Sequence, residues 1–268
     1  MPGFRRLFQG SQNWLFVLPS IAMLALFALP LAALAERAIR EDFLGYALSS
    51  SALAALRLSI VTSLLTVLIT IILGTPLAYI LARRGFALKQ VVEMLVDLPV
   101  ILPPSVAGLS LLIAFGRQGF FGKTLALFNI SLPFTTTAVI IAQTFVAAPL
   151  YVRSARAGFR AVERQLVEAA HVEGANQWQL FREVMLPLAG RFLLNGAILT
   201  WTRALGEFGA TILFAGNMEG VTQTMPLAIY LGFERGLGIA VALSMLLVIT
   251  SIILLAATKR LEKDDHLA

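Results

Sequence analysis

The chain has 268 residues, of which 58% are hydrophobic and only 13% charged, with a mean hydropathy of +0.84. Soluble domains carry about 25% charged residues, so this composition excludes an ordinary soluble protein and predicts a membrane protein. The absence of cysteine excludes disulfides, thiolate metal sites and cysteine nucleophiles, and the two histidines, His171 and His266, are too few for a multi-histidine metal site.

The first part of the chain contains two predicted spans. Residues 1–13 carry two arginines and no acid. The apolar run at 14–35 is too long for a signal peptide and lacks a clear cleavage site, so we expect it to be the first span, entered from the cytoplasm. Residues 36–51 mix both charges and form an external loop. The run at 52–82 exceeds the ~20 residues needed to cross a bilayer and is the second span.

The third predicted span, at residues 98–115, is interrupted by Pro99, Pro103, Pro104 and Gly108. Residues 91–98 before it are expected to lie along the surface as a short amphipathic piece. The prolines leave carbonyls without helical partners, which in hydrocarbon must be satisfied by protein or by a water-filled cavity. Two interpretations remain open: a kink packed against neighbouring helices, or an irregular segment that lines a translocation path.

Three more spans are predicted in the second half of the chain. An outer loop at 116–133 leads to the fourth span at 135–151. The fifth span covers 188–214, and an outer segment at 215–237 separates it from the sixth, at 238–257.

The longest charged segment, residues 160–187, is predicted to form two short amphipathic helices. Gly174 stands where the first helix would end in a left-handed conformation. Asn176 and Gln179 predict a capping box at the start of the second. Pro187 disfavours helix at the residue before it and is expected to mark the boundary with the fifth span. The apolar positions are Val162, Leu166, Ala169 and Ala170 in the first helix and Trp178, Phe181, Val184 and Met185 in the second.

The distribution of lysine and arginine predicts the orientation. Fourteen lie in the predicted inner segments and five in the outer ones, with Arg57 and Arg203 inside spans. This bias predicts an all-α membrane protein of six transmembrane helices with both termini in the cytoplasm. The same dispersal between apolar spans argues against nucleic acid as a partner. The inner residues are Arg5, Arg6, Arg83, Arg84, Lys89, Arg153, Arg156, Arg160, Arg164, Arg182, Arg191, Lys259, Arg260 and Lys263, and the outer ones are Arg37, Arg40, Arg117, Lys123 and Arg235.

The predicted organisation therefore has three parts. A cytoplasmic N-terminal segment covers residues 1–13, and a cytoplasmic tail covers 259–268. Between them lies a six-span transmembrane domain at 14–258, with a long cytoplasmic loop at 153–187.

Eight residues of the charged segment resemble the EAA loop of ABC-importer permeases: Glu168, Ala169, Ala170, Gly174, Ala175, Phe181, Leu186 and Pro187. The resemblance implies a coupling helix that docks into a groove on an ATPase subunit, and the type I (MetI-like) permease fold. The alternative for this segment is an ordinary polar loop between two spans.

Arg203 and Glu207 are the informative charges within a predicted span. Their i, i+4 spacing places them on one helical face, where they can pair. Ionisable residues in spans usually face the bundle interior or an aqueous cavity. The pair is either a structural ion pair near the outer interface, or a device in which Arg203 helps an anion along the pathway while Glu207 holds it in place. The full set of pathway candidates is Pro99, Pro103, Pro104, Ser105, Arg203, Glu207 and Thr211.

The same region resembles permeases of molybdate and tungstate importers, over residues 203–211, 215–217 and 222–230, and residues 98–112 resemble the corresponding span of oxyanion permeases. This resemblance implies a multi-pass inner-membrane protein that works by alternating access. It implies a permease homodimer in the lipid membrane, two ATP-binding ABC subunits that hold ATP and magnesium, and an external (periplasmic) oxyanion-binding protein. The chain lacks a phosphate-binding loop, so no enzymatic activity, catalytic residue, metal or cofactor of its own is expected.

Other functions remain as alternatives. A sulfate or thiosulfate ABC permease would keep the architecture and change the cargo, and nothing in the sequence separates molybdate from tungstate. An ion-coupled secondary transporter would need acids at mid-bilayer and would leave the coupling pattern unused. A membrane-embedded enzyme is disfavoured because histidine, aspartate and cysteine are not clustered.

Overall fold

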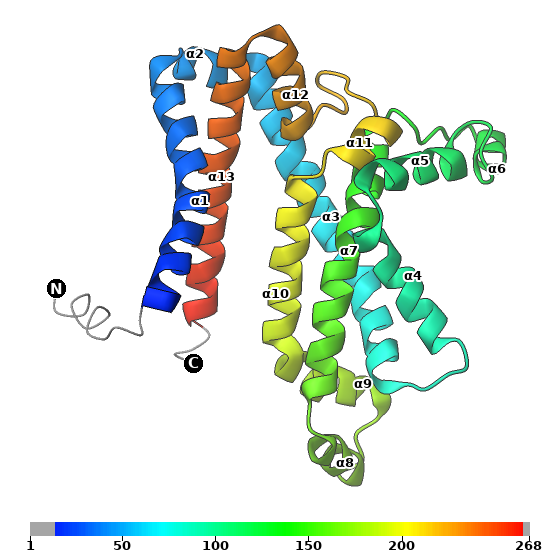
Figure 1. Ribbon diagram of the computed structural model, residues 1–268. Helices are drawn as coiled ribbons and strands as arrows, with labels where there is room; N and C mark the ends of the chain where they lie inside the picture. The colour runs from blue at the N-terminus through cyan, green and yellow to red at the C-terminus, as the bar shows by residue number, and fades with distance from the viewer. Residues whose placement is uncertain (1–13, 265–268) are drawn as a thin grey trace.

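The computed structural model describes residues 14–264, with side chains described as far as residue 256. The predicted segment 1–13 and the end of the predicted tail, 265–268, lie outside the described residues. The described chain is helical (Figure 1). Its helices are α1 (Trp14–Arg40), α2 (Phe43–Ala47), α3 (Ser50–Arg83), α4 (Lys89–Ile101), α5 (Pro104–Phe115), α6 (Gly122–Leu127), α7 (Thr136–Ala161), α8 (Arg164–Val172), α9 (Gln177–Gln179), a π-helical turn (Leu180–Met185), α10 (Leu186–Leu205), α11 (Gly209–Phe214), α12 (Met225–Arg235) and α13 (Leu237–Asp264).

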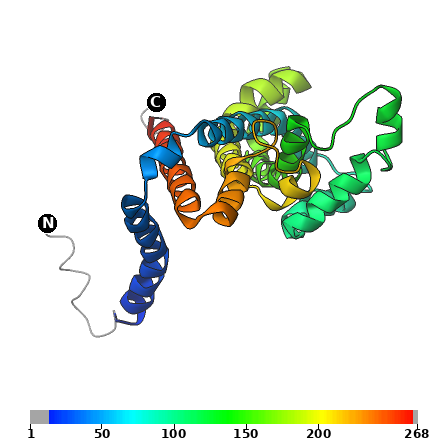
Figure 2. The same cartoon turned by 90° about the horizontal axis from the view of Figure 1, so that it is seen from above.

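Three long helices form the centre of the bundle. α7 packs along both α3 and α10, and α3 also contacts α10. α13 packs mainly on α12 and α2, and α1 packs on α13. Figures 1 and 2 show α1 and α13 at one side of this bundle, with α5 and α6 extending from the opposite side. α8 and α9 lie at the lower end of the bundle in Figure 1, and α2 and α12 at the upper end.

The face that α3 turns to the bundle consists mainly of small and hydroxyl side chains, with Leu81 near its end. Its buried polar positions are Ser59, Thr62, Ser63, Thr66, Thr70 and Thr75. The Thr66 hydroxyl donates to the Gln143 side-chain oxygen of α7 at 3.2 Å, and the Trp201 indole of α10 donates to the Ser63 hydroxyl at 3.0 Å. Small residues allow helices to approach closely in lipid, where packing and interhelical hydrogen bonds replace the hydrophobic effect as the driving force.

Five helices of the described chain are long and apolar enough to cross a membrane, and a sixth span results if α4 and α5 are counted together. α4 and α5 are bent by 118° relative to each other. The bend lies at Leu102 and Pro103, whose ψ angles of 138° and 136° are extended. Pro103 and Pro104 supply no N–H, and a residue that precedes a proline is kept out of the helical region. The predicted interruption of this span is thus confirmed, but its predicted start is wrong, since residues 89–101 form one helix.

The fifth span also differs from its predicted limits. The helix does not stop before Pro187, because residues 177–205 form one apolar helix that includes the π-helical turn. It ends at Leu205 instead of continuing to residue 214, and α11 is a separate short helix. Gly206 caps α10, and Glu207 and Phe208 connect it to α11. The wider π-helical turn ends at Met185, and Pro187 is the second residue of α10, where a proline is tolerated because it lies in the first turn of a helix.

Two other boundaries matter for the site. α7 continues past residue 151 to Ala161, so the first residues of the predicted coupling loop at 153–187 are helical. The predicted outer segment 215–237 contains the helix α12.

Candidate coupling and translocation sites

The first part of the predicted coupling segment forms α8 and ends at Gly174. This glycine has φ +85°, a conformation that costs roughly 1–2 kcal/mol for a residue with a Cβ. The Ala175 N–H donates to the Ala170 carbonyl at 2.9 Å, and the Gly174 N–H donates to the His171 carbonyl at 3.1 Å. These two bonds form a Schellman motif, so the predicted helix stop at Gly174 is confirmed.

The second part begins with the predicted capping box. The Asn176 side chain accepts hydrogen bonds from the Trp178 and Gln179 N–H groups, each at 3.0 Å, and the Gln179 side chain accepts from the Asn176 N–H at 2.9 Å. Because the Schellman motif and this box share the turn at residues 174–176, the direction of the chain is fixed on both sides of it.

Phe181 ties this segment to the bundle. Its ring centroid lies 5.1 Å from that of Tyr79 in α3 and 6.1 Å from that of Phe159 in α7. Tyr79 and Phe159 pack edge to face at 5.6 Å. Aromatic pairs in this distance range contribute about 0.5–1.5 kcal/mol beyond their buried area. Phe181 therefore connects the predicted coupling segment to two of the three central helices, α3 and α7.

The π-helical turn is the second attachment. Met185, at its end, is fully buried. The Met185 sulfur lies 3.6 Å from an Arg83 guanidinium nitrogen, which also donates to the Val162 carbonyl at 2.8 Å. Arg83 thereby joins the lower ends of α3 and α7 to the turn that leads into α10.

α8 itself has no buried residue and leaves apolar side chains exposed. Leu166 is 45% exposed and Val172 89%, whereas Val167 and Ala170 pack against the bundle. Ala169 is exposed. The predicted apolar face is therefore confirmed at Val162 and Ala170, which pack in the core, but wrong at Leu166 and Ala169, and Val167 packs against the core instead.

The remaining coupling candidates differ in their exposure to solvent. Glu168 is exposed and pairs with Arg164 at 2.7 Å, Ala175 and Leu186 are half-buried, and Pro187 is exposed. The structure therefore keeps the eight residues in one helix–turn–helix unit without gathering their side chains into a pocket.

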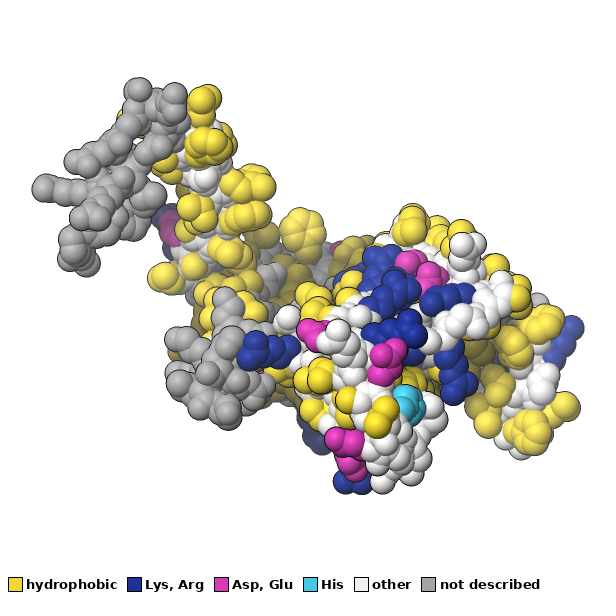
Figure 3. Space-filling model, turned by 90° about the horizontal axis from the view of Figure 1, so that it is seen from below, with side chains coloured by type: hydrophobic (Ala, Val, Ile, Leu, Met, Phe, Trp, Pro, Cys, Tyr) yellow, Lys and Arg dark blue, Asp and Glu magenta, His cyan; other side chains and the backbone are white. Residues whose placement is uncertain are grey.

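Ion pairs join α4 to α7 above this unit, and sequence reasoning missed them. Arg153 pairs with Asp97 at 2.6 Å, and Glu93 pairs with both Arg156 at 3.0 Å and Arg160 at 3.1 Å. Figure 3 shows basic side chains gathered on the lower face with acidic ones among them. The sequence did contain a pattern that indicates such pairing, because the two acids are spaced i, i+4 and the three arginines share one helical face.

The break between α4 and α5 borders a cavity of about 140 Å³. This volume is several times the ~30 Å³ that one water molecule occupies in the liquid. Its lining residues are Pro99, Val100, Leu102, Pro104, Val146, Leu150 and Arg203. Three predicted pathway residues, Pro99, Pro104 and Arg203, thus meet at one cavity, and Arg203 supplies the charge among the lining residues. Pro103 and Ser105 are exposed at the same break.

The predicted Arg203–Glu207 pair is confirmed, with 2.7 Å between Nη1 and Oε2. The Glu207 side chain is 1% exposed and that of Arg203 34%. Glu207 lies beyond the end of α10, and its Oε1 accepts a hydrogen bond from the Ala210 N–H at 2.8 Å. One buried carboxylate therefore both balances Arg203 and fixes the start of α11.

α11 packs closely against α5, and glycines on both helices form the contact. A Cβ on Gly108 would lie 2.7 Å from the Ala210 carbonyl oxygen, and one on Gly209 would lie 2.7 Å from the Pro104 Cβ. This contact confirms that small residues allow close helix approach here. Thr211, the last pathway candidate, is fully buried in α11 and does not line the cavity.

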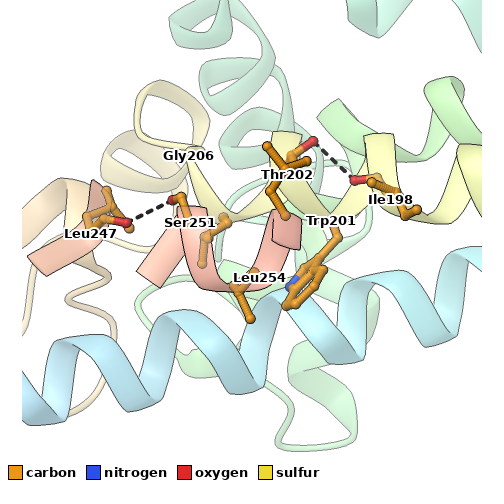
Figure 4. Close-up of a pocket in the computed structure, with 9 residues that line it drawn as sticks. Ile198, Trp201, Thr202, Gly206, Leu247, Ser251 and Leu254 are labelled. Carbon is orange, nitrogen blue, oxygen red and sulfur yellow. Dashed lines mark hydrogen bonds between the residues drawn. The ribbon is translucent and has the colours of Figure 1, made fainter. Parts of the chain in front are cut away.

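A second hollow, of about 110 Å³, lies between α10 and α13 (Figure 4). Its polar side chains, Thr202 and Ser251, donate to the carbonyls of Ile198 and Leu247 within their own helices. Trp201 and leucines form much of the rest of its lining. Because its lining residues carry no charge and its hydroxyls are already engaged, this hollow is unsuited to an anion.

Residues 74–263 match the family model of the binding-protein-dependent transport system inner membrane component. The chain belongs to this family. It is 42% identical over 209 residues to the probable transport system permease protein NifC of Clostridium pasteurianum, a match that covers 78% of this chain and 73% of NifC. It is 40% identical over 239 residues to the molybdenum transport system permease protein ModB of Mycobacterium tuberculosis (strain ATCC 25618 / H37Rv), over 89% of this chain and 90% of ModB.

The fold agrees with the family. A bacterial ABC transporter involved in the import of the acidic polysaccharide alginate contains a chain that superposes with a TM-score of 0.78, over 97% of this chain and 98% of that chain, at 16% identity. This identity supports the fold alone. The predicted ABC-importer permease fold of the type I (MetI-like) class is confirmed, and the chain is a multi-pass inner-membrane transport permease.

Proposed function

We propose that this chain is the membrane-spanning subunit of an ATP-driven importer that takes up molybdate or tungstate. The substrate class rests on the similarity to the molybdenum permease ModB, which extends over 89% of this chain. ATP hydrolysis belongs to a separate subunit in this proposal, because the sequence has no phosphate-binding loop.

The observation that carries the proposal is the construction of the coupling segment. α8 leaves Leu166 and Val172 exposed, and Trp178 beside it is 65% exposed. Exposed apolar groups on a rigid, projecting helix–turn–helix are typical of a protein interaction site. We infer that this surface docks on an ATPase subunit that holds ATP and magnesium.

The excess of lysine and arginine at the predicted inner segments supports an orientation with both termini and the coupling segment in the cytoplasm. Two copies of the permease, two ATPases and an external oxyanion-binding protein complete the proposed importer. The family description and the alginate transporter solved with its periplasmic protein support the binding protein as a partner.

The proposed mechanism is alternating access driven from the coupling segment. Closure of the ATPases would move α8, and Phe181 would transmit this motion to Tyr79 and Phe159 in α3 and α7. The Arg83 contacts with Val162 and Met185 would carry the same displacement into α10. Packed helices transmit such motion as rigid bodies, because protein interiors have little free volume.

Arg203 is the residue that we propose to help the oxyanion across. Arg203 lines the cavity beside the α4–α5 break, and its charge is already balanced by Glu207. A partly neutralised arginine would attract an anion without holding it permanently, which conduction requires.

Sulfate or thiosulfate is the alternative cargo within the same architecture. An ion-coupled secondary transporter is a weaker alternative, since it would leave the docking surface of α8 without a role.

The test is ATP hydrolysis by the purified permease–ATPase complex in lipid, with binding protein loaded with molybdate, tungstate or sulfate. Stimulation by molybdate- or tungstate-loaded protein alone is the expected result. Stimulation by sulfate would replace the proposed cargo and keep the architecture. Failure of any ATPase subunit to associate would overturn the coupling role of α8.

A further inference from the structure

The segment between α5 and α7 presents an exposed apolar surface. We define the outer apolar patch as Phe120, Phe121, Leu127, Phe128 and Ile130. Phe120 is 83% exposed, Leu127 81% and Phe128 71%. The sequence predicted this segment, 116–133, as an ordinary outer loop.

The patch is held outward by a folded backbone. The Phe120 and Phe121 N–H groups donate to the carbonyls of Ile113 and Ala114 at the end of α5, at 3.3 and 2.9 Å. The Phe121 ring stacks on Phe115 with 5.7 Å between centroids. A Cβ on Gly122 would lie 1.7 Å from the Gly116 carbonyl oxygen, so the fold of this segment requires glycine there.

We propose that the outer apolar patch is a membrane anchor that inserts its side chains into the interface of the outer leaflet. The inference goes beyond transport itself, and only its choice of leaflet rests on the proposed function and orientation. Aromatic side chains are enriched at membrane–water interfaces. An apolar surface flanked by lysine or arginine, which can reach the headgroups, is typical of segments that lie in the plane of the membrane.

The position of the segment fits this occupant. In Figure 1, α6 lies at about the height at which α7 begins, and Figures 1 and 2 both show it extending sideways from the bundle, on the side opposite α1. It thus points along the plane of the membrane rather than out of it. The exposed side chains of Leu109 and Ile113 on α5 continue the apolar surface toward the patch.

Charge supports a lipid partner over a second copy of the chain. Arg117 and Lys123 lie within the segment, and the sequence contains no acid between Asp97 and Glu163. In a two-fold interface the same surface meets itself, so the partner's copy of this segment would offer these cations no carboxylate. Anionic headgroups would complement them instead.

The large exposed fraction of the side chains in the outer apolar patch argues against a transient partner. Leaving a large apolar side chain in water costs about 1.5–3 kcal/mol relative to burial. A binding protein that comes and goes would leave the three most exposed side chains in water for part of each cycle, whereas the bilayer covers them permanently. An anchored segment would also hold the end of α5, whose Gly108 packs against Ala210 of α11.

The absence of cysteine makes a direct test possible. Phe128→Cys and Leu127→Cys would each be spin-labelled in the full permease–ATPase complex reconstituted in vesicles that contain anionic lipid. Collision rates with oxygen, which partitions into lipid, and with a water-soluble nickel chelate would then be measured. Ile72→Cys on the exposed face of α3 is the control for lipid, and Glu219→Cys in an exposed turn is the control for water.

The expected result is an oxygen-to-nickel collision ratio at residues 127 and 128 several-fold above that of Glu219→Cys and approaching that of Ile72→Cys. A ratio equal to that of Glu219→Cys would place the patch in water and overturn the proposal. Low collision rates with both reagents would show that protein covers the patch, which also overturns it. Substrate-stimulated ATP hydrolysis of the same samples reports on the proposed function separately, so either idea can fail while the other stands.

Discussion

At the scale of single residues, Glu207 has two tasks that depend on one another. Its carboxylate pairs with Arg203 and also accepts the N–H of Ala210 at the start of α11. The cost of burying this charge is offset only while both partners stay in place. A substitution of Arg203 therefore changes the folding of the protein as well as any role in transport, and an experiment must separate the two.

We predict that Arg203→Ala lowers both membrane level and uptake. It leaves the Glu207 charge unpaired, which costs about 3 kcal/mol, the low end of the range for buried pairs because Arg203 is partly exposed. In the double variant Arg203→Ala/Glu207→Gln, the amide oxygen still accepts from Ala210 and no unpaired charge remains. We expect thermal stability and membrane level to recover while molybdate uptake stays low. Recovery of uptake along with stability would reduce the pair to a structural role.

Gly174 gives a second prediction at this scale. A valine there would be forced into φ +85°, at a cost of about 1–2 kcal/mol for a residue with a Cβ, although a Cβ would meet no atom within 4 Å. We expect Gly174→Val to keep a normal membrane level and to reduce substrate-stimulated ATP hydrolysis several-fold. Gly174→Asn is the matched control, because asparagine tolerates this conformation. Equal activity of the two variants would count against the importance of the turn.

At the scale of helices, local chemistry decided what could be predicted from sequence. The Schellman stop at Gly174 and the capping box at Asn176 involve residues a few positions apart, so the pattern contained all of their partners. The break after Leu205 was missed because the run at 188–214 is predominantly apolar and contains no proline, while the break depends on Glu207 bonding to Ala210. The contacts of α4 with α7 were missed because they join residues 56 positions apart, as between Asp97 and Arg153.

The role of Phe181 can be tested against its exposed neighbour. Phe181→Ala removes the ring that contacts Tyr79 and Phe159 and should cost up to about 3 kcal/mol, since burial of Phe181 is partial. We expect this variant to bind the ATPase but to hydrolyse ATP without transport. Trp178→Ala should instead weaken ATPase binding with little effect on permease stability. The measurements are co-purification, ATP hydrolysis and uptake; identical behaviour of the two variants would contradict separate roles.

The α4–α7 ion pairs make a modest prediction. The Asp97 and Arg153 side chains are 30% and 40% exposed, so Asp97→Asn should lower stability by no more than about 1 kcal/mol. The exchange Asp97→Arg/Arg153→Asp should restore the melting temperature if pairing is what matters. A loss that the exchange fails to recover would point to packing instead.

At the scale of the whole molecule, the orientation can be measured with single cysteines in this cysteine-free chain. Val172→Cys at the exposed end of α8 should react with a membrane-impermeant maleimide only in inside-out vesicles. Glu219→Cys, in the turn before α12, should react only from the outer face. Labelling of both from one side would contradict the proposed topology, because α10 and the segment after it would then fail to cross.

The hydroxyl-rich face of α3 has a consequence for how the protein is made. The Thr66 hydroxyl finds its Gln143 partner 77 residues later in the chain, which at about 5–20 residues per second is a wait of roughly 4–15 s during translation. Meanwhile α3 has entered the membrane without α7. Thr62, Ser63 and Thr75 each donate to a carbonyl of α3 itself, at 2.9, 3.1 and 2.6 Å, so three of the six buried hydroxyls on this face are already satisfied in hydrocarbon. The helix can thus leave the insertion machinery early and remain stable in the lipid until its partner helix is synthesised.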